Sequence, residues 1–171
     1  MPLYFAYGSN MDVAAMQVRC PRSRPVSRAI LPRHRFIIMA EGYASVQRDG
    51  TRSVHGVLWD VALGDMRTLD TYESIGSGLY TKISQPVLRD AGASVRALVY
   101  VGRGKGGGRP LDGYMEAVIA AAKSWQLPEN YMRELSALAP GMGQTTTSQG
   151  FTQPTVAPKV RPRFATPLDR R

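Results

Sequence analysis

The chain has 171 residues, of which 43% are hydrophobic, so it is long enough for one domain with a buried core. No stretch approaches the roughly 20 apolar residues of a membrane-spanning helix, and no basic segment precedes an apolar run at the N-terminus, so neither a membrane nor a secreted protein is expected. The single cysteine, Cys20, excludes an internal disulfide framework and is typical of a reducing compartment, so the expected location is cytoplasmic.

The formal net charge of +9 comes from 22 Lys and Arg against 13 Asp and Glu. Such an excess raises the question of nucleic-acid binding. The basic residues gather in the segment 19–35 and in the last residues, KVRPRFATPLDRR, and the segment 19–35 lacks the interleaved aromatic residues of a groove for single strands. Solubilising surface charge is therefore favoured, and a nucleic-acid partner is the less favoured interpretation.

From the N-terminus, residues 3–6 form an apolar run typical of a short strand. A turn, Gly8-Ser9-Asn10, leads from this run into a predicted helix over about 11–19. Residues 20–28, rich in Pro and Arg, are expected to form a loop. Residues 35–39 are again apolar and predict a second strand.

The middle of the chain contains a strong turn signal, Asp49-Gly50. It lies between residues 44–48 and the alternating run 54–61, so these two segments are predicted to pair as a hairpin. A short helix is expected over 63–72, because its apolar residues have helical spacing. Two further strands are predicted over 79–88 and 95–101.

The next segment, GRGKGGGRP, covers residues 102–110 and resembles a phosphate-binding loop only superficially, because Gly108 stands where the lysine is required. A mobile connector or an active-site flap is favoured there. Asp112 is expected to cap a helix with an apolar face from Met115 to Ala122, and Pro128 is expected at the first turn of a last helix. Strands that cluster early and helices that cluster late predict an α+β fold.

Residues 1–140 are therefore expected to form one domain. Residues 141–171 read as a basic tail rich in Pro, Thr and Gln, which is expected to be extended or disordered when free. The alternatives are that this tail lies over the body of the domain or reaches a partner chain. The second alternative allows a homo-oligomer that forms through the tail.

Few side chains are placed for catalysis. No cluster of His, Cys, Asp and Glu has metal-ligand spacing, so no metal site is expected. The two histidines, His34 and His55, are expected to have structural or surface roles. Cys20 precedes proline in a basic loop, where a lowered thiol pKa competes with the simpler interpretation of a plain thiol.

Glu73 is the best candidate for acid–base chemistry. It ends the predicted helix over 63–72, next to Tyr72 and before a glycine-rich turn and Tyr80. A carboxylate among aromatic side chains loses hydration, which raises its pKa toward the range useful for general acid–base catalysis. On spacing alone, a solvated glutamate at a helix end is the competing interpretation.

Four segments, taken in order, resemble the γ-glutamylcyclotransferase-like family, which includes AIG2-like proteins. They are YFAYGSNM, GYASVQRDGTRSVHGVLWDV, LDTYESIGSGLYTK and YMEAVIAAAKSWQLPENY, and together they span roughly residues 3–138. The motif YGSN after a first strand is moderately specific alone. It becomes specific when it is followed by LDxYE with a later GxY and by a helix that ends in LPxxY.

The resemblance implies a small mixed β-barrel surrounded by helices, and an enzyme that needs neither a cofactor nor a metal. The implied reaction is an intramolecular acyl transfer on a small γ-glutamyl substrate, which releases 5-oxoproline and a free amine or amino acid. Glu73 matches the family's catalytic glutamate. The leaving group and the pathway are not given by the resemblance, since family members differ in both.

The resemblance also implies substrate-binding residues. The backbone N–H groups of Gly8, Ser9 and Asn10 are suited to hold anionic or carbonyl oxygens of the substrate, with a plain tight corner as the alternative. Tyr7 is expected to line the same cavity. Tyr80 and Tyr114 match family tyrosines and are candidate hydrogen-bond donors, with packing at the edge of the core as the alternative.

Two other functions compete with catalysis. One is a non-catalytic module of the same fold that binds a small anion, and the presence of Glu73 counts against it. The other is a nucleic-acid-associated protein that uses the segment 19–35 and the tail. Salt-sensitive binding to DNA or RNA that disappears with residues 143–171 is the behaviour expected of the second.

Overall fold

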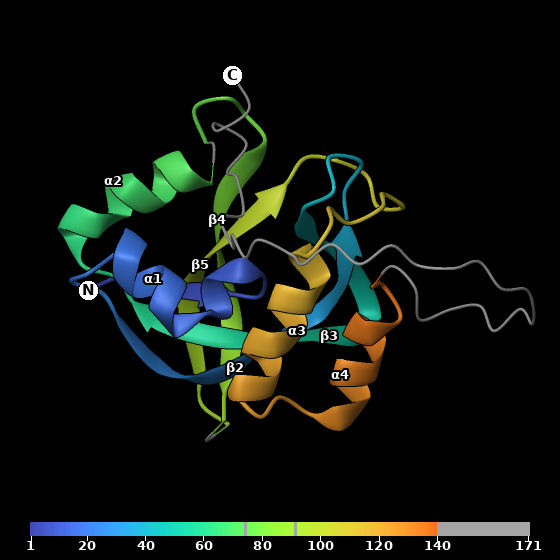
Figure 1. The fold of residues 1–171 in the computed structure, drawn as a ribbon. Helices are drawn as coiled ribbons and strands as arrows, with labels where there is room; N and C mark the ends of the chain where they lie inside the picture. Colours follow the sequence, from blue (N-terminus) through green and yellow to red (C-terminus); the bar gives the residue numbers. More distant parts are fainter. Residues whose placement is uncertain (74, 91, 140–171) are drawn as a thin grey trace, which may run out of the picture.

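The apolar run at the N-terminus becomes the strand that closes a barrel. The computed structural model describes residues 1–73, 75–90 and 92–139, and Figure 1 shows a ring of strands with helices around it. The strands are β1 (Leu3–Ala6), β2 (Arg24–Ile38), β3 (Ala44–Asp60), β4 (Tyr80–Arg89) and β5 (Ser94–Gly102). The helices are the 3-10 helix η1 (Ser9–Met11), α1 (Val13–Arg19), α2 (Leu63–Tyr72), α3 (Tyr114–Ser124) and α4 (Glu129–Ser136).

The order around the closed barrel is β1-β3-β2-β4-β5. β1 runs antiparallel to β3, from Leu3 opposite Asp60 to Ala6 opposite Val57, and parallel to β5, with Tyr4 opposite Leu98. All other neighbouring pairs are antiparallel. The expected α+β class and the small mixed barrel are therefore confirmed. The expected tail, residues 141–171, lies outside the described residues.

The predicted hairpin around Asp49-Gly50 is wrong. Residues 44–60 form one long strand, β3, and both of its halves pair with β2. The turn chemistry at Asp49 is nevertheless present, because Asp49 Oδ1 accepts hydrogen bonds from the backbone N–H and the hydroxyl of Thr51. It produces a bulge: the pairing partner of Pro32 is Ser53 and that of His34 is Arg48, so four residues of β3 are left out of the ladder.

The chain reverses instead at residues 39–43, between Ile38 and its partner Ala44. Gly42 has φ of 84° there, a left-handed conformation that glycine adopts without strain. The expected loop over 20–28 is also too long, because β2 already begins at Arg24 and includes Pro25. Backbone pairing with β3 overrides the loop-like composition of this segment.

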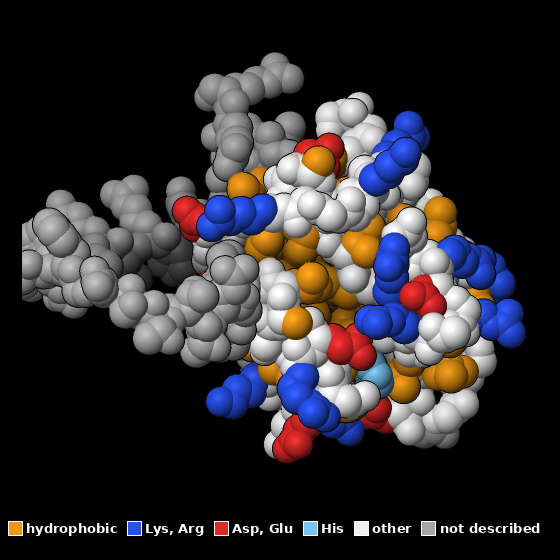
Figure 2. All heavy atoms as spheres, turned by 90° about the vertical axis from the view of Figure 1, so that its right-hand side faces the viewer, with side chains coloured by type: hydrophobic (Ala, Val, Ile, Leu, Met, Phe, Trp, Pro, Cys, Tyr) orange, Lys and Arg blue, Asp and Glu red, His pale blue; other side chains and the backbone are white. Residues whose placement is uncertain are grey.

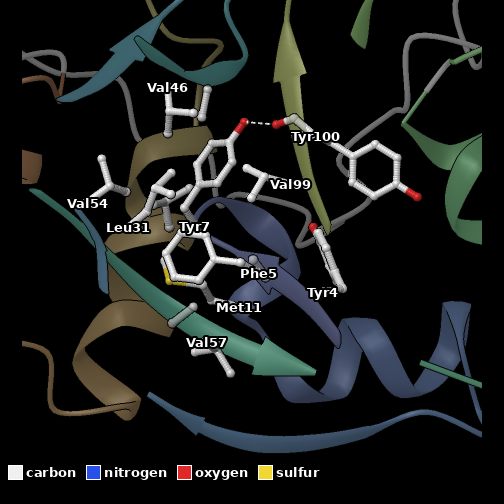
Figure 3. Packing of buried hydrophobic residues seen from close by; sticks show 14 of the residues in the cluster. Tyr4, Phe5, Tyr7, Met11, Leu31, Val46, Val54, Val57, Val99 and Tyr100 are labelled. Atoms are coloured by element: carbon white, nitrogen blue, oxygen red, sulfur yellow. Dashed lines mark hydrogen bonds between the residues drawn. The ribbon is translucent and has the colours of Figure 1, made fainter. Parts of the chain in front are cut away.

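The two faces of the first strand lie in different surroundings. Figure 3 shows Phe5 and Tyr7 among aliphatic side chains such as Leu31, whereas Tyr4 lies on the other side of β1 beside Tyr100. Phe5 is fully buried, and burying an aromatic side chain of this kind contributes about 2 kcal/mol. Tyr4 and Tyr100 meet edge to face, with ring centres 5.4 Å apart. β1 thus separates an apolar interior from a wall that carries hydroxyl groups.

The helices hold the turn that follows β1. Asp12 caps α1 by accepting a hydrogen bond from the Ala15 N–H at 2.7 Å. The indole N–H of Trp125, at the end of α3, donates to the carbonyl of Met11 at 2.9 Å and ties α3 to η1. The expected cap at Asp112 is wrong: the cap of α3 is Gly113, whose φ of 75° a residue with a side chain adopts only with strain. Among the described residues, no helix is long and apolar enough to span a membrane.

Most arginines of the segment 19–35 bond within the fold. Arg22 contacts the buried carboxylate of Asp65, Arg28 contacts Asp90, and Arg35 donates to Gln47. Arg19 contacts Asn10. These contacts give four of the segment's six arginines an intramolecular partner.

Gly56 provides a test of how closely β1 packs on β3. A Cβ at this position would lie 2.2 Å from the carbonyl oxygen of Ala6 and 2.8 Å from Cζ of Phe5. Because one of these atoms is backbone, we expect Gly56→Ala to reduce the free energy of unfolding by about 3 kcal/mol. Gly50→Ala, where no atom lies within 4 Å, should change it little in the same urea titration. Equal stability of the two variants would contradict this account of barrel closure.

Candidate active site

The turn Gly8-Ser9-Asn10 leaves the barrel at the end of β1 and forms the 3-10 helix η1. Its hydrogen bonds run from the N–H groups of Met11 and Asp12 back to the carbonyls of Gly8 and Ser9. The N–H groups of Gly8, Ser9 and Asn10 have no partner among the residues that the structure describes. A Cβ at Gly8 would lie 3.1 Å from the Tyr114 hydroxyl, so the small residue brings this backbone close to Tyr114.

Glu73 directly follows α2 and caps it, with its N–H bonded to the Leu69 carbonyl at 2.9 Å. The residue is half-buried, but its carboxylate points inward to the turn after β1. Asn10 Nδ2 donates to Glu73 Oε1 at 2.7 Å, and the Tyr4 hydroxyl lies 3.4 Å from the same oxygen. No hydrogen bond to Oε2 is found among the described residues. One oxygen is therefore held, and the other is available to a ligand.

Burial raises the pKa of Glu73 from 4.5 to about 7. The hydrogen bond from Tyr4, the positive charge of Arg19 and the hydrogen bond from Asn10 oppose this rise. Burial also raises the pKa of Tyr4 and Tyr7 well above 10, so both are neutral phenols near pH 7. The site thus contains one carboxyl group that exchanges its proton near neutral pH.

A small hollow of about 30 Å³ lies between Glu73 and the turn. All seven residues predicted for the site line it, although they come from four separate parts of the chain. Its lining is Tyr4, Tyr7, Gly8, Ser9, Asn10, Ala44, Glu73, Tyr80, Tyr100 and Tyr114. Their roles in binding or catalysis stay predictions.

The tyrosine hydroxyls are largely engaged with the backbone. Tyr7 donates to the Tyr100 carbonyl at 2.5 Å, as the dashed line in Figure 3 shows. Tyr80 donates to the Ala44 carbonyl at 2.6 Å, and Tyr114 accepts from the Ala44 N–H at 3.2 Å. As bonded here, Tyr7 and Tyr80 offer a ligand only acceptor lone pairs. The turn's backbone N–H groups are therefore the better candidates for donors to an anionic oxygen.

Sequence reasoning missed Tyr4, Tyr100 and Asp70. Tyr4 contacts Glu73, and the Tyr100 hydroxyl donates to Asp70 Oδ1 at 2.5 Å. Asp70 in turn binds Lys82, with both oxygens 2.7 Å from the ammonium nitrogen. The available signal was that two strands rich in aliphatic residues, LYFA and SVRALVYVG, carry tyrosine at positions that would be buried. A buried tyrosine needs a partner for its hydroxyl.

Other candidates from the sequence lie elsewhere. His34 is buried with Nδ1 2.8 Å from the Pro32 carbonyl oxygen, and His55 packs on the Tyr131 ring. Cys20 is a buried thiol whose pKa is raised to about 11 by burial and by Asp65. Within the described part of the chain, no three His, Cys, Asp or Glu residues gather as they would around a metal ion.

A larger groove lies on another face, between the far end of β2 and the end of α4. Figure 2 shows that face, with hydrophobic side chains at the floor of a hollow and Lys and Arg around it. The floor includes Phe36, Ile38 and Leu138. The groove contains no carboxylate with a raised pKa and none of the predicted site residues. Its size alone does not make it a catalytic site, so the smaller hollow at Glu73 is the better candidate.

Known proteins resemble this chain in sequence and in fold. The model of the AIG2-like family matches residues 53–135. The γ-glutamylcyclotransferase of Mus musculus is 27% identical over 148 residues, which cover 81% of this chain and 79% of that protein, and the protein of the same name from Homo sapiens is 26% identical over the same shares. A solved structure named γ-glutamyl cyclotransferase superposes with a TM-score of 0.76 at 24% identity, covering 86% of this chain and 94% of the other.

The raised pKa of Glu73 predicts a distinctive dependence of stability on pH. Because the folded-state pKa is near 7 and that of a free glutamate is 4.5, the folded protein holds this proton more tightly, so stability falls as pH rises through this window. At about 1.4 kcal/mol per pH unit, we expect wild type to lose about 3 kcal/mol more than Glu73→Gln between pH 4.5 and 8. Urea unfolding at both pH values measures the difference. Glu116→Gln, at an exposed glutamate of α3, should follow wild type. Parallel profiles for wild type and Glu73→Gln would contradict the prediction.

Proposed function

The chain belongs to the γ-glutamylcyclotransferase-like (AIG2-like) family, and from this we propose that it is an enzyme that releases 5-oxoproline from a γ-glutamyl compound. The substrate's own α-amine attacks its γ-carbonyl carbon, and the amide nitrogen leaves as a free amine or amino acid. The observation that carries the proposal is the Glu73 carboxyl group, buried opposite the turn after β1, whose N–H groups at Gly8, Ser9 and Asn10 have no partner among the described residues.

In the first step, Glu73 acts as a general base. The α-amine of a γ-glutamyl group is protonated at neutral pH and has no lone pair with which to attack. A carboxylate with a pKa near 7 can accept that proton at a small free-energy cost, whereas one with an ordinary pKa is a much weaker base. The oxygen Oε2, which has no hydrogen bond among the described residues, is the proposed acceptor.

Attack of the amine places negative charge on the former carbonyl oxygen. Preoriented donors that meet this oxygen lower the barrier, and a single one is typically worth about 3 kcal/mol. The N–H groups of Gly8, Ser9 and Asn10 are the proposed donors. The neighbouring tyrosines support this assignment, since Tyr7 and Tyr80 already donate their protons to backbone carbonyls.

In the last step, Glu73 returns a proton to the leaving nitrogen as the carbon–nitrogen bond breaks. The attacking nitrogen enters with three protons and keeps one in the lactam, so two protons must pass to the leaving nitrogen, which departs as an ammonium ion. The same carboxyl group serves as base and as acid in each of these two transfers, and no proton is gained or lost overall. Because the nucleophile and the electrophile belong to one molecule, the protein needs only to hold the bent substrate. No water is consumed, since the products are 5-oxoproline and the free amine.

The competing function is a non-catalytic module that binds a small anion in the same hollow. Both functions use the turn after β1, but only catalysis needs a carboxyl group that titrates near pH 7. Replacing Glu73 therefore separates them, because a binding module without chemistry has no turnover to lose.

We expect Glu73→Gln to reduce 5-oxoproline release by a factor of about 10² to 10⁴, because it removes the general base and acid. The amide is nearly isosteric with the carboxyl group, so the variant should keep the wild-type circular dichroism spectrum. Release is measured on a panel of γ-glutamyl amino acids, γ-glutamyl amines and glutathione, with Glu116→Gln as the matched control. Background release from wild type on the whole panel, equal to that of Glu73→Gln, would favour the binding module.

A further inference from the structure

Arg19, the last residue of α1, reaches the candidate site through one other side chain. Its Nη1 donates to Asn10 Oδ1 at 2.7 Å, and Asn10 Nδ2 donates to Glu73 Oε1 at 2.7 Å. We propose that Arg19 is a positioning residue, which holds the Asn10 amide in the one orientation that donates to Glu73. The proposal rests on the proposed function, in which Glu73 is the base and the acid.

The chemistry of the guanidinium group dictates this orientation. An arginine side chain carries only donors, so the amide oxygen of Asn10 must face it and the NH₂ group must face the other way. The NH₂ group has two protons, and the two acceptors in range are Glu73 Oε1 and, at 3.1 Å, the Tyr4 hydroxyl. A flipped amide would set donor against donor at Arg19 and oxygen against oxygen at Glu73. Asn10 is only 3% exposed, so water offers no alternative partner.

Arg19 is itself held by the residue that precedes Glu73. Its guanidinium carbon lies 3.9 Å from the centre of the Tyr72 ring, and the Tyr72 hydroxyl lies 3.4 Å from Ser9 Oγ. Arg19 therefore connects the turn after β1 to the end of α2, the two segments that form the site. A lysine supplies charge but cannot stack a planar group on Tyr72 while it donates to Asn10 in a fixed direction.

The charges around Glu73 make the effect of Arg19 measurable. The titratable groups that face Glu73 come from every side of the hollow: Tyr4 of β1, Tyr7 just after β1, Arg19 of α1, Asp70 and Tyr72 of α2, Tyr80 of β4, Tyr100 of β5 and Tyr114 of α3. Burial keeps the hollow's tyrosines neutral by raising their pKa values. The negative charge of Asp70 is neutralised by Lys82. Removing Arg19 should therefore raise the pKa of Glu73.

The test is a titration of the Glu73 carboxyl group by ¹³C NMR in wild type, Arg19→Met and Arg24→Met. Arg24 is exposed and its side chain bonds to none of the described residues, so its variant controls for the loss of one positive charge. We expect the midpoint of Glu73 to rise by about one pH unit in Arg19→Met and to stay at the wild-type value in Arg24→Met. Equal midpoints in the two variants would overturn the proposal.

A double-mutant cycle tests whether Asn10 carries the effect. In an Asn10→Ala background, Arg19→Met should shift the Glu73 midpoint by less than half as much as in wild type. An undiminished shift would mean that Arg19 acts as a bare charge, which would overturn the positioning role. Arg19→Lys replaces Arg19→Met in these comparisons if Arg19→Met does not fold. We expect its Glu73 midpoint to lie between those of wild type and Arg19→Met. A wild-type midpoint in Arg19→Lys would contradict the role of the fixed guanidinium geometry.

The rate of 5-oxoproline release gives the second measurement. The acidic limb of the pH profile of kcat/KM should move up by the same pH unit in Arg19→Met, so that the loss is about tenfold at pH 6 and small at pH 9. A merely structural role would lower the rate equally at all pH values, which would contradict the proposal. If no variant and no wild type releases 5-oxoproline, the proposed function fails, while the NMR titration still decides the role of Arg19.

Discussion

The candidate site is organised by one part-buried contact, the hydrogen bond from the Asn10 amide to the Glu73 carboxylate. These residues are 63 positions apart: Asn10 lies in η1, shortly after β1, and Glu73 directly follows α2. Burial destabilises the ionised form of Glu73 and raises its pKa, whereas Tyr4, Arg19 and the Asn10 amide stabilise that form and offset part of the rise. The balance leaves a group that can lose and regain a proton near neutral pH, whereas full compensation would fix it as an ion.

The barrel makes this contact possible because it fixes β1 between two neighbouring strands. The strand is only four residues long, yet it is bonded on both edges, to β3 and to β5. Its side chains alternate between two faces. Phe5 fills the barrel interior, while Tyr4 packs against Tyr100 on the other face (Figure 3). Glu73, at the end of α2, lies on this second face and contacts Tyr4. Tyr100 also bonds to Asp70, one turn before Glu73, and so helps to fix the end of α2 against the barrel.

Several elements of the fold could be predicted from the sequence, because their local sequence patterns agree with the places that they take in the barrel. The strand-turn-helix at residues 3–19, the helix before Glu73 and the mixed barrel were all predicted. The hairpin at Asp49-Gly50 failed because the Asx hydrogen bonds there are local and do not decide whether a strand reverses or bulges. The intramolecular partners of the arginine-rich segment could not be predicted, because composition does not show them: the contact of Arg19 with Asn10 arises only when α1 packs beside the turn.

β1 links the closure of the barrel to the candidate site. β1, the strand that completes the barrel, leads into Gly8-Ser9-Asn10. A ligand bound by that turn would therefore also stabilise β1 in its place between β3 and β5. Binding of a ligand in the hollow should therefore slow amide hydrogen exchange in the β1–β3 ladder as well as around the hollow itself. Closure of the barrel and retention of a ligand in the hollow would thus depend on the same four-residue strand.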